Sequence, residues 1–152
     1  MFLCIRRGFD AVCVERLDGD FAAGHYLQLG GVLPLLIGAA PRVLLAALPD
    51  EEIASYLARP LSQNTPKTPV DPDELWSAIR DIRDTGGSVS RDDVLLGVKA
   101  FGAPVYDHTG AVVAALSLSG ISAHIPDEQE PHVLQQVRQA ADKASSALGY
   151  TA

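Results

Sequence analysis

The sequence predicts an α+β domain built on an antiparallel sheet of about six strands flanked by helices. Two observations predict this class. Apolar residues alternate with period two in the first thirty residues and again between residues 88 and 122, whereas elsewhere they recur at spacings of three and four. Short turn signals join neighbouring strands, which only antiparallel strands allow. The expected order is three strands, three helices, three strands and one helix.

In the N-terminal half, strands are expected at residues 2–5, 11–17 and 25–29, which read FLCI, AVCVERL and HYLQL. A helix follows to Leu48 and starts near Ala39 or Ala40, because Pro41 is tolerated only in a first turn. A second short helix covers residues 49–58. The four prolines between residues 59 and 72 indicate an ordered surface loop or a flap.

The C-terminal half opens with a strong helix start, in which Asp71 is the N-cap and Pro72 the first helical residue. Gly86 and Gly87 end this helix. Strands are then expected at residues 88–90, 98–106 and 111–122, the last two joined by a hairpin turn at residues 107–110. A final helix runs over residues 130–148.

The composition indicates one domain, residues 1–152, with a sizeable core. The net charge of −7 has the same sign as the phosphates of a nucleic-acid backbone and would repel them, so this chain alone is not expected to bind DNA. No apolar run is long enough for a membrane span, and no secretory leader is visible in the first thirty residues. With only two cysteines, each in an apolar strand, we expect buried, reduced thiols in a cytoplasmic protein.

The strand at residues 111–122 carries two hydroxyls in an otherwise apolar run, Ser117 and Ser119, on one face with Val113 and Ala115. The other face holds Val112, Ala114, Leu116 and Leu118. A buried hydroxyl without a partner costs roughly 1–3 kcal/mol, so these serines need an acceptor or a ligand.

Small residues gather where that ligand would lie. Gly38, Ala39 and Ala40 begin a helix whose free amides attract an anion, and Ala100 and Gly102 lie on the neighbouring strand. The pattern is typical of a closed pocket for a small anionic ligand. An equally weighted alternative is that the serines bond to neighbouring backbone and the small residues only permit close packing.

Signals for catalysis are weak. The chain has no nucleophile elbow and no phosphate-binding loop with its lysine, and its four histidines are scattered singly. Asp92 and Asp93, in a loop beside Arg91, favour a structural role, and Cys4 and Cys13 lie inside strands where a reactive thiolate is not favoured. We therefore expect no enzyme, no catalytic residue, no metal and no cofactor.

Three segments carry a family resemblance: LQLGGVLPLLIGAAPRVLLAALPDEE, TPKTPVDPDEL and GVKAFGAPVYDHTGAVVAALSLSG, the last from Gly97 to Gly120. Together they resemble the C-terminal effector-binding domain of IclR-type transcriptional regulators over nearly the whole chain. The resemblance implies a GAF-like fold, a small-molecule effector, and a homodimer or tetramer. It also implies that DNA is bound only through an N-terminal winged helix-turn-helix that this chain lacks.

The resemblance also implies the ligand-binding residues. Carried over by position, they are Ala39, Ala40, Ser90, Val98, Ala100, Ser117 and Ser119. The chain departs from the family pattern where a frequent His, Gly and Lys are replaced by Leu36, Pro41 and Arg42. These less polar walls favour an apolar or aromatic acid over a small hydrophilic one.

The leading hypothesis is a ligand-sensing and oligomerisation domain that binds a small organic acid, carboxylic or aromatic, and modulates DNA binding, as part of either a repressor or an activator. A second hypothesis is a purely structural dimerisation module whose pocket is filled by its own side chains. A third is a GAF-fold thiol reductase that uses Cys4 and Cys13. The three differ in whether the pocket opens and whether the thiols react.

Overall fold

The computed structural model describes residues 1–19 and 27–152. Its strands are β1 (Phe2–Arg7), β2 (Asp10–Arg16), β3 (Val32–Pro34), β4 (Ser88–Arg91), β5 (Val98–Tyr106) and β6 (Val112–Ile121). Its helices are α1 (Ala39–Ala46), α2 (Asp50–Leu57), α3 (Pro72–Thr85) and α4 (Glu130–Ala147), with short 3-10 turns η1 (Ser122–His124) and η2 (Asp127–Gln129) before α4. The expected order of strands and helices is confirmed.

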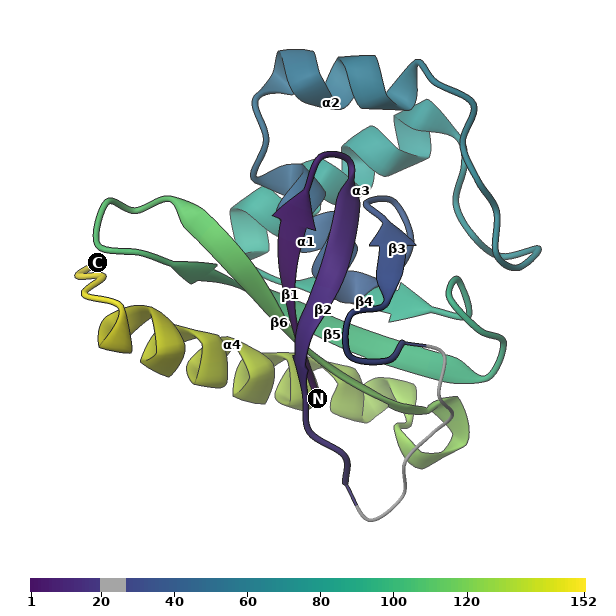
Figure 1. Cartoon of the computed structure of the whole chain (residues 1–152). Coiled ribbons are helices and arrows are strands. Elements are labelled where there is room, and N and C mark those ends of the chain that lie inside the picture. The colour runs from purple at the N-terminus through teal and green to yellow at the C-terminus, as the bar shows by residue number, and fades with distance from the viewer. Residues whose placement is uncertain (20–26) are drawn as a thin grey trace.

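The strands form one antiparallel sheet in the order β3-β2-β1-β6-β5-β4. The first strand of the chain therefore pairs with the last, with Phe2 opposite Ser117. Helices α1, α2 and α3 lie over one face of the sheet, and α4 runs along the other (Figure 1). This is the predicted α+β architecture, and no helix within the described residues is long and apolar enough to cross a membrane.

The third strand differs from the prediction at residues 25–29. Residues 27–29 are not in a strand, and the pairing with β2 is made by Val32–Pro34 instead, whereas His25 and Tyr26 lie outside the described residues. The cause is a tight turn in which Gly30 has φ 78° and donates its amide to the carbonyl oxygen of Cys13 at 2.7 Å. Alternation alone does not reveal such a turn.

The two faces of the sheet bury separate apolar clusters, as the alternation in β6 predicts: Ala115 packs beneath α1, and Ala114 packs against α4. One residue is on the other face from the prediction. Val112 packs on the α1 side, because a β-bulge shifts the register between Val105 and Tyr106 and leaves Val113 40% exposed. The bulge reverses the alternation at this end of the strand.

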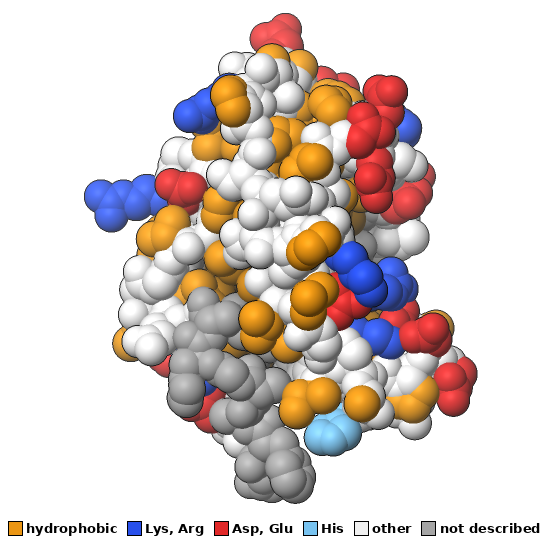
Figure 2. Space-filling view, turned by 90° about the vertical axis from the view of Figure 1, so that its right-hand side faces the viewer, with side chains coloured by type: hydrophobic (Ala, Val, Ile, Leu, Met, Phe, Trp, Pro, Cys, Tyr) orange, Lys and Arg blue, Asp and Glu red, His pale blue; other side chains and the backbone are white. Residues whose placement is uncertain are grey.

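Local signals set the helix ends. The Asp71 carboxylate accepts the amide of Asp73 at 3.4 Å at the start of α3, and Gly86 ends that helix with φ 70°. Helix α1 begins at Ala39 with Pro41 in its first turn, as predicted. On the molecular face shown in Figure 2, acidic side chains gather in the upper part and a compact basic group lies below them.

Gly102 in β5 lets the first turn of α1 lie directly on the sheet. A Cβ atom at this position would stand 2.9 Å from the carbonyl carbon of Ala39 and 3.0 Å from the amide nitrogen of Ala40. Both neighbours are backbone atoms of a buried helix and have no side-chain freedom with which to move aside. Close packing between α1 and β5 therefore requires glycine here.

An ion network centred on the buried side chains of Lys99 and Glu130 fastens α4 to the opposite face of β5. The Lys99 ammonium lies 2.6 Å from the Asp127 carboxylate and 2.8 Å from that of Glu130. Arg91 in β4 also pairs with Glu130 through both of its carboxylate oxygens. These cations hold the pKa of Glu130 at about 2, against an ordinary 4.5.

We predict that Gly102→Ala destabilises the domain by about 1–3 kcal/mol, because the new methyl group meets the α1 backbone. Gly120→Ala is the matched control, since its Cβ would meet only the movable end of the Ile125 side chain, and its effect is expected within about 0.5 kcal/mol. Urea unfolding of both variants measures the difference. Equal effects of the two substitutions would contradict the close approach.

We predict that the domain loses stability in acid through Glu130. Its folded pKa lies below the ordinary value, so its contribution is complete above about pH 5 and is lost as pH falls through 4.5 toward 2. Glu130→Gln is expected to be less stable at pH 7 and to flatten the fall in stability between pH 5 and pH 2. The measurement is urea unfolding at several pH values, with Glu128→Gln, an exposed neighbour, as the control. An unchanged pH slope in Glu130→Gln would contradict the assignment.

Candidate functional site

A small cavity lies between the start of α1 and the sheet. Its walls come from β1, β3, β5, β6, α1 and the loops beside them, and its volume is about 20 Å³. That is room for about one water molecule. The lining residues are Phe2, Cys4, Leu27, Leu33, Gly38, Ala39, Ala40, Pro41, Val94, Ala100 and Ser117.

Four of the seven residues predicted to bind ligand line this cavity: Ala39, Ala40, Ala100 and Ser117. The other three, Ser90, Val98 and Ser119, do not line it. Ser90, Ala100 and Ser119 nevertheless form one row across β4, β5 and β6. Gly102 and Ser117 form the next row, so the sheet residues of the predicted site share the face beneath α1.

Ser117 lines the cavity, and its hydroxyl makes no hydrogen bond to a described residue. Ser117 is 5% exposed and lines the cavity wall. No hydrogen bond from the side chain of Ser117 or Ser119 to any described residue is present in the structure, so the backbone bonds of the alternative hypothesis are not seen. No fully buried side-chain oxygen among the described residues lacks a partner, so the Ser117 hydroxyl keeps some accessible surface, and a polar ligand atom or water suits it as a partner.

The N-terminus of α1 supplies donors beside this hydroxyl. The amide of Gly38, whose φ is 98°, donates to a carboxylate oxygen of Asp93 at 3.1 Å. The next two amides, those of Ala39 and Ala40, are at helix positions with no intrahelical acceptor, and Pro41 has no amide proton. Two donors at the positive end of the helix are thus left at the cavity wall.

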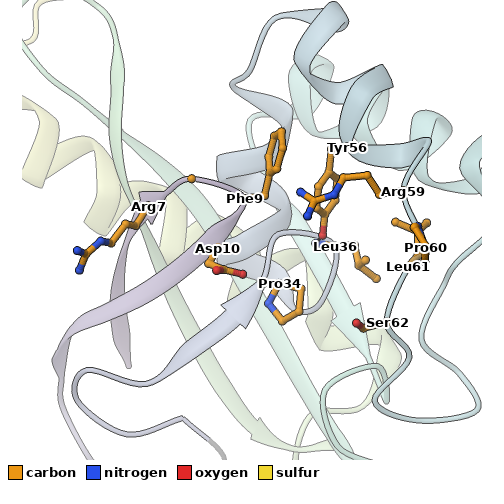
Figure 3. A pocket seen from close by; sticks show the side chains of 11 residues that line it. Arg7, Phe9, Asp10, Pro34, Leu36, Tyr56, Arg59, Pro60, Leu61 and Ser62 are labelled. Carbon is orange, nitrogen blue, oxygen red and sulfur yellow. Dashed lines mark hydrogen bonds between the residues drawn. The ribbon is translucent and has the colours of Figure 1, made fainter.

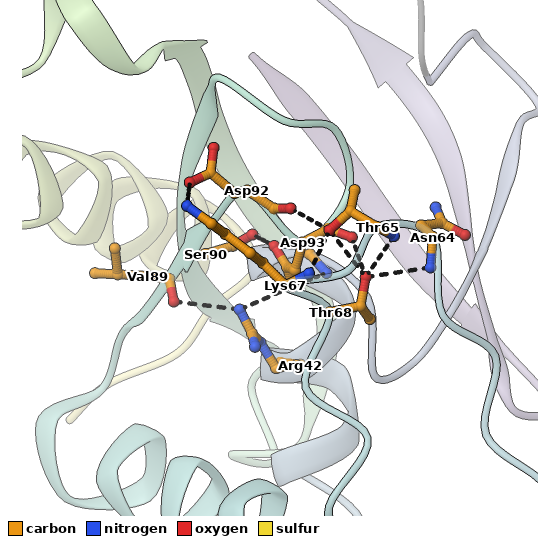
Figure 4. Close-up of polar contacts among 10 residues, drawn as sticks. Arg42, Asn64, Thr65, Lys67, Thr68, Val89, Ser90, Asp92 and Asp93 are labelled. Carbon is orange, nitrogen blue, oxygen red and sulfur yellow. Dashed lines mark hydrogen bonds and ion pairs between the residues drawn. The ribbon is translucent and has the colours of Figure 1, made fainter.

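Asp93 makes the central polar contact of this region (Figure 4). Its carboxylate is 1% exposed, lies 3.2 Å from the guanidinium of Arg42, and accepts the hydroxyl of Ser90. Arg42 also donates to the carbonyl oxygen of Val89 at 3.2 Å. Burial lowers the pKa of Arg42, and the charge of Asp93 opposes that shift. The pair joins α1 to β4 and to the loop after it.

Asp92 points elsewhere, so the two adjacent carboxylates do not form a catalytic pair. Asp92 pairs with Lys67 at 3.1 Å and accepts the amide of Gly97 at 2.6 Å. The hydroxyls of Thr65 and Thr68 donate to the carbonyl oxygens of Asp92 and Asp93 at 2.5 and 2.6 Å (Figure 4). The proline-rich segment between residues 59 and 72 is therefore an ordered loop that packs against the site. An ordered loop was one of the two structures expected from the sequence, the other being a flap.

The cysteines lie together but are poor nucleophiles. Cys4 and Cys13 are directly opposite in β1 and β2, both are buried and free, and Cys4 lines the cavity. Burial raises the pKa of Cys4 to about 12 and also raises that of Cys13. A thiolate, which a reductase needs, is thereby disfavoured. Within residues 1–19 and 27–152, no three His, Cys, Asp or Glu side chains are grouped so that they could hold a metal ion.

Several cavity residues were not foreseen from the sequence. Phe2 and Cys4 enter the site because β1 pairs with β6, a contact between opposite ends of the chain that no local pattern reports. Val94 reaches it from the loop between β4 and β5, and the carboxylate of Asp93, which is outside the lining, accepts the amide of the lining residue Gly38. The sequence around Asp93, SRDDV, does not indicate its burial or its pairing with Arg42.

Comparisons with known proteins identify the family of this chain. The family model described as "Bacterial transcriptional regulator IclR C-terminal" matches residues 1–146. The chain is 32% identical over 150 residues to the HTH-type transcriptional regulator KipR of Bacillus subtilis, covering 98% of this chain and 60% of that protein. It therefore spans only about 60% of the length of this relative.

Two solved structures share the fold. The Thermotoga maritima IclR structure matches with a TM-score of 0.88 and 29% identity, over 98% of this chain and 61% of that one. The Agobacterium tumefaciens repressor BlcR matches with a TM-score of 0.93 over 99% of this chain and 60% of that one; at 24% identity this likeness concerns the fold alone. With the family model spanning nearly all residues, the chain belongs to the IclR family of bacterial transcriptional regulators and corresponds to its C-terminal, effector-binding domain.

Proposed function

We propose that the domain senses a small organic acid in the cavity beneath α1 and passes this signal to a DNA-binding domain outside this chain. The observation that supports the proposal best is Ser117, a residue 5% exposed that lines the cavity and whose hydroxyl bonds to no described residue. The free amides of Ala39 and Ala40 lie at the same cavity. Together they offer three hydrogen-bond donors, and the cavity lining contains no carboxylate that would repel an anion.

These donors suit a carboxylate. Its oxygens would accept the amides of Ala39 and Ala40 at the positive end of the helix, with the Ser117 hydroxyl as a further donor. The rest of the lining is apolar and includes Phe2, Leu33 and Val94. An acid with an apolar or aromatic body would bury that surface and is favoured over a small hydrophilic acid such as pyruvate.

Binding requires the cavity to widen. A volume of about 20 Å³ holds a water molecule and no organic acid. Asp93 and Arg42 neutralise each other behind the helix start, so the ligand charge is met by neutral donors rather than by a free cation. The walls that are free to move are the apolar side chains, since the helix start itself is tied to Asp93.

A ligand controls regulation only by binding two arrangements of the protein with different affinity. In the proposed regulator the closed cavity and the widened, ligand-filled cavity belong to two such arrangements of a cytoplasmic dimer or tetramer. The attached DNA-binding domains would then be held at different spacings. In the competing hypothesis, a structural dimerisation module, the cavity stays closed and no ligand stabilises the domain.

We predict that an apolar or aromatic carboxylate raises the melting temperature of the domain and that Ser117→Ala reduces this shift. A ligand present at 100 times its dissociation constant stabilises the fold by roughly 2.7 kcal/mol, which is about 5–10 °C for a domain of this size. The measurement is a thermal-shift screen of aliphatic and aromatic acids on both proteins. Ser146→Ala, on the exposed side of α4, is the matched control and is expected to keep the full shift.

Three results would each count against a part of the proposal. A shift of equal size in Ser117→Ala and in the control would remove Ser117 from the site. No shift with any acid, in a protein that melts cooperatively, would favour the structural module. A large shift with pyruvate and none with apolar acids would keep the site and overturn the proposed ligand class.

A further inference from the structure

A second and much larger pocket opens on the other side of the segment that leads into α1. It lies between the β1–β2 turn, β3 and the end of α2, and its volume is about 350 Å³ (Figure 3). That volume falls within the range of small-molecule sites in proteins, about 300–1,000 Å³. Its lining shares no residue with the cavity beneath α1.

The floor of this pocket is apolar and well supported. Leu36 and Tyr56 are buried there, and Phe9, Pro34 and Leu61 are half-buried around them. The Phe9 and Tyr56 rings lie 5.1 Å apart between centroids. The Tyr56 hydroxyl accepts the amide of Leu36 at 3.2 Å, which fixes the tyrosine at the floor. Such a floor suits an apolar or aromatic group.

Two opposite charges flank the floor. The Asp10 carboxylate and the Arg59 guanidinium come from different sides and point toward the space in front of Tyr56, whereas the guanidinium of Arg7 points away (Figure 3). Burial raises the pKa of the Tyr56 hydroxyl, the charge of Asp10 adds a smaller rise, and the charge of Arg59 opposes it. The Arg59 guanidinium lies 5.1 Å from the centre of the Phe9 ring, which holds it over the pocket.

Neither charge has an ion-pair partner in the part of the chain that the structure describes, and the two do not pair with each other. A ligand that carried only a negative charge would meet the carboxylate of Asp10, and a cation would meet Arg59. A molecule with both charges and an apolar body satisfies the carboxylate, the guanidinium and the floor at once. We propose that this pocket binds a free amino acid with a hydrophobic side chain, its carboxylate paired with Arg59 and its ammonium group with Asp10.

The test uses L-phenylalanine as the probe, followed by amide NMR titration. Saturable shifts are expected at the amides of residues 8–10, 59, 61 and 62, which border the pocket. Hydrocinnamate lacks the ammonium group and phenethylamine lacks the carboxylate, so each is expected to bind at least about tenfold more weakly, a loss of about 1.4 kcal/mol. Arg59→Gln and Asp10→Asn are expected to weaken phenylalanine binding by a similar factor.

Two control variants separate this site from the cavity beneath α1. Arg80→Gln removes an exposed arginine on α3 and Ser117→Ala changes the other cavity, and both are expected to bind phenylalanine as the unmodified chain does. Equal binding of phenylalanine and its two analogues would overturn the proposal. So would shifts confined to the amides of Ala39 and Ala40, or the absence of a saturable shift in the folded protein.

Discussion

The rest of the site depends on the buried carboxylate of Asp93. It accepts the Gly38 amide at 3.1 Å, pairs with Arg42 at 3.2 Å and accepts the hydroxyl of Ser90, so one side chain joins α1 to β4. A charge that is 1% exposed is stable only when it is paired and hydrogen-bonded, and removing one partner of such a pair typically costs about 3–5 kcal/mol. The position of the α1 N-terminus is therefore set by electrostatics across the fold.

Gly102 completes this placement from the sheet side. Because it has no side chain, β5 comes against the backbone of Ala39 and Ala40, and their amides are brought close to Ser117 on the neighbouring strand. The same strand carries Lys99 on its other face, where it pairs with Asp127 and Glu130 before and within α4. Strand β5 thus links the cavity beneath α1 to the helix on the far side of the sheet.

The two pockets lie on either side of the chain between β3 and α1. Leu36, near the middle of that segment, forms the floor of the larger pocket, and Gly38, two residues on, borders the smaller one. The Tyr56 hydroxyl holds the Leu36 amide, and Asp93 holds that of Gly38. A segment of three residues is thus fixed from two sides, which places any ligand of either pocket against the same piece of backbone.

The sequence by itself determined the features that depend on neighbouring residues. Pro41 and Asp71 located two helix starts, Gly86 a helix end, and the alternation in β6 the shared face of Ser117 and Ser119. The family resemblance placed Ala39, Ala40, Ala100 and Ser117 together. Three features were decided only by the tertiary structure. They are the β-bulge that moves Val112 to the other face of the sheet, the position of Phe2 and Cys4 in the cavity wall, and the pairing of Asp93 with Arg42. Those features depend on strand register and on contacts between distant parts of the chain, which local periodicity does not encode.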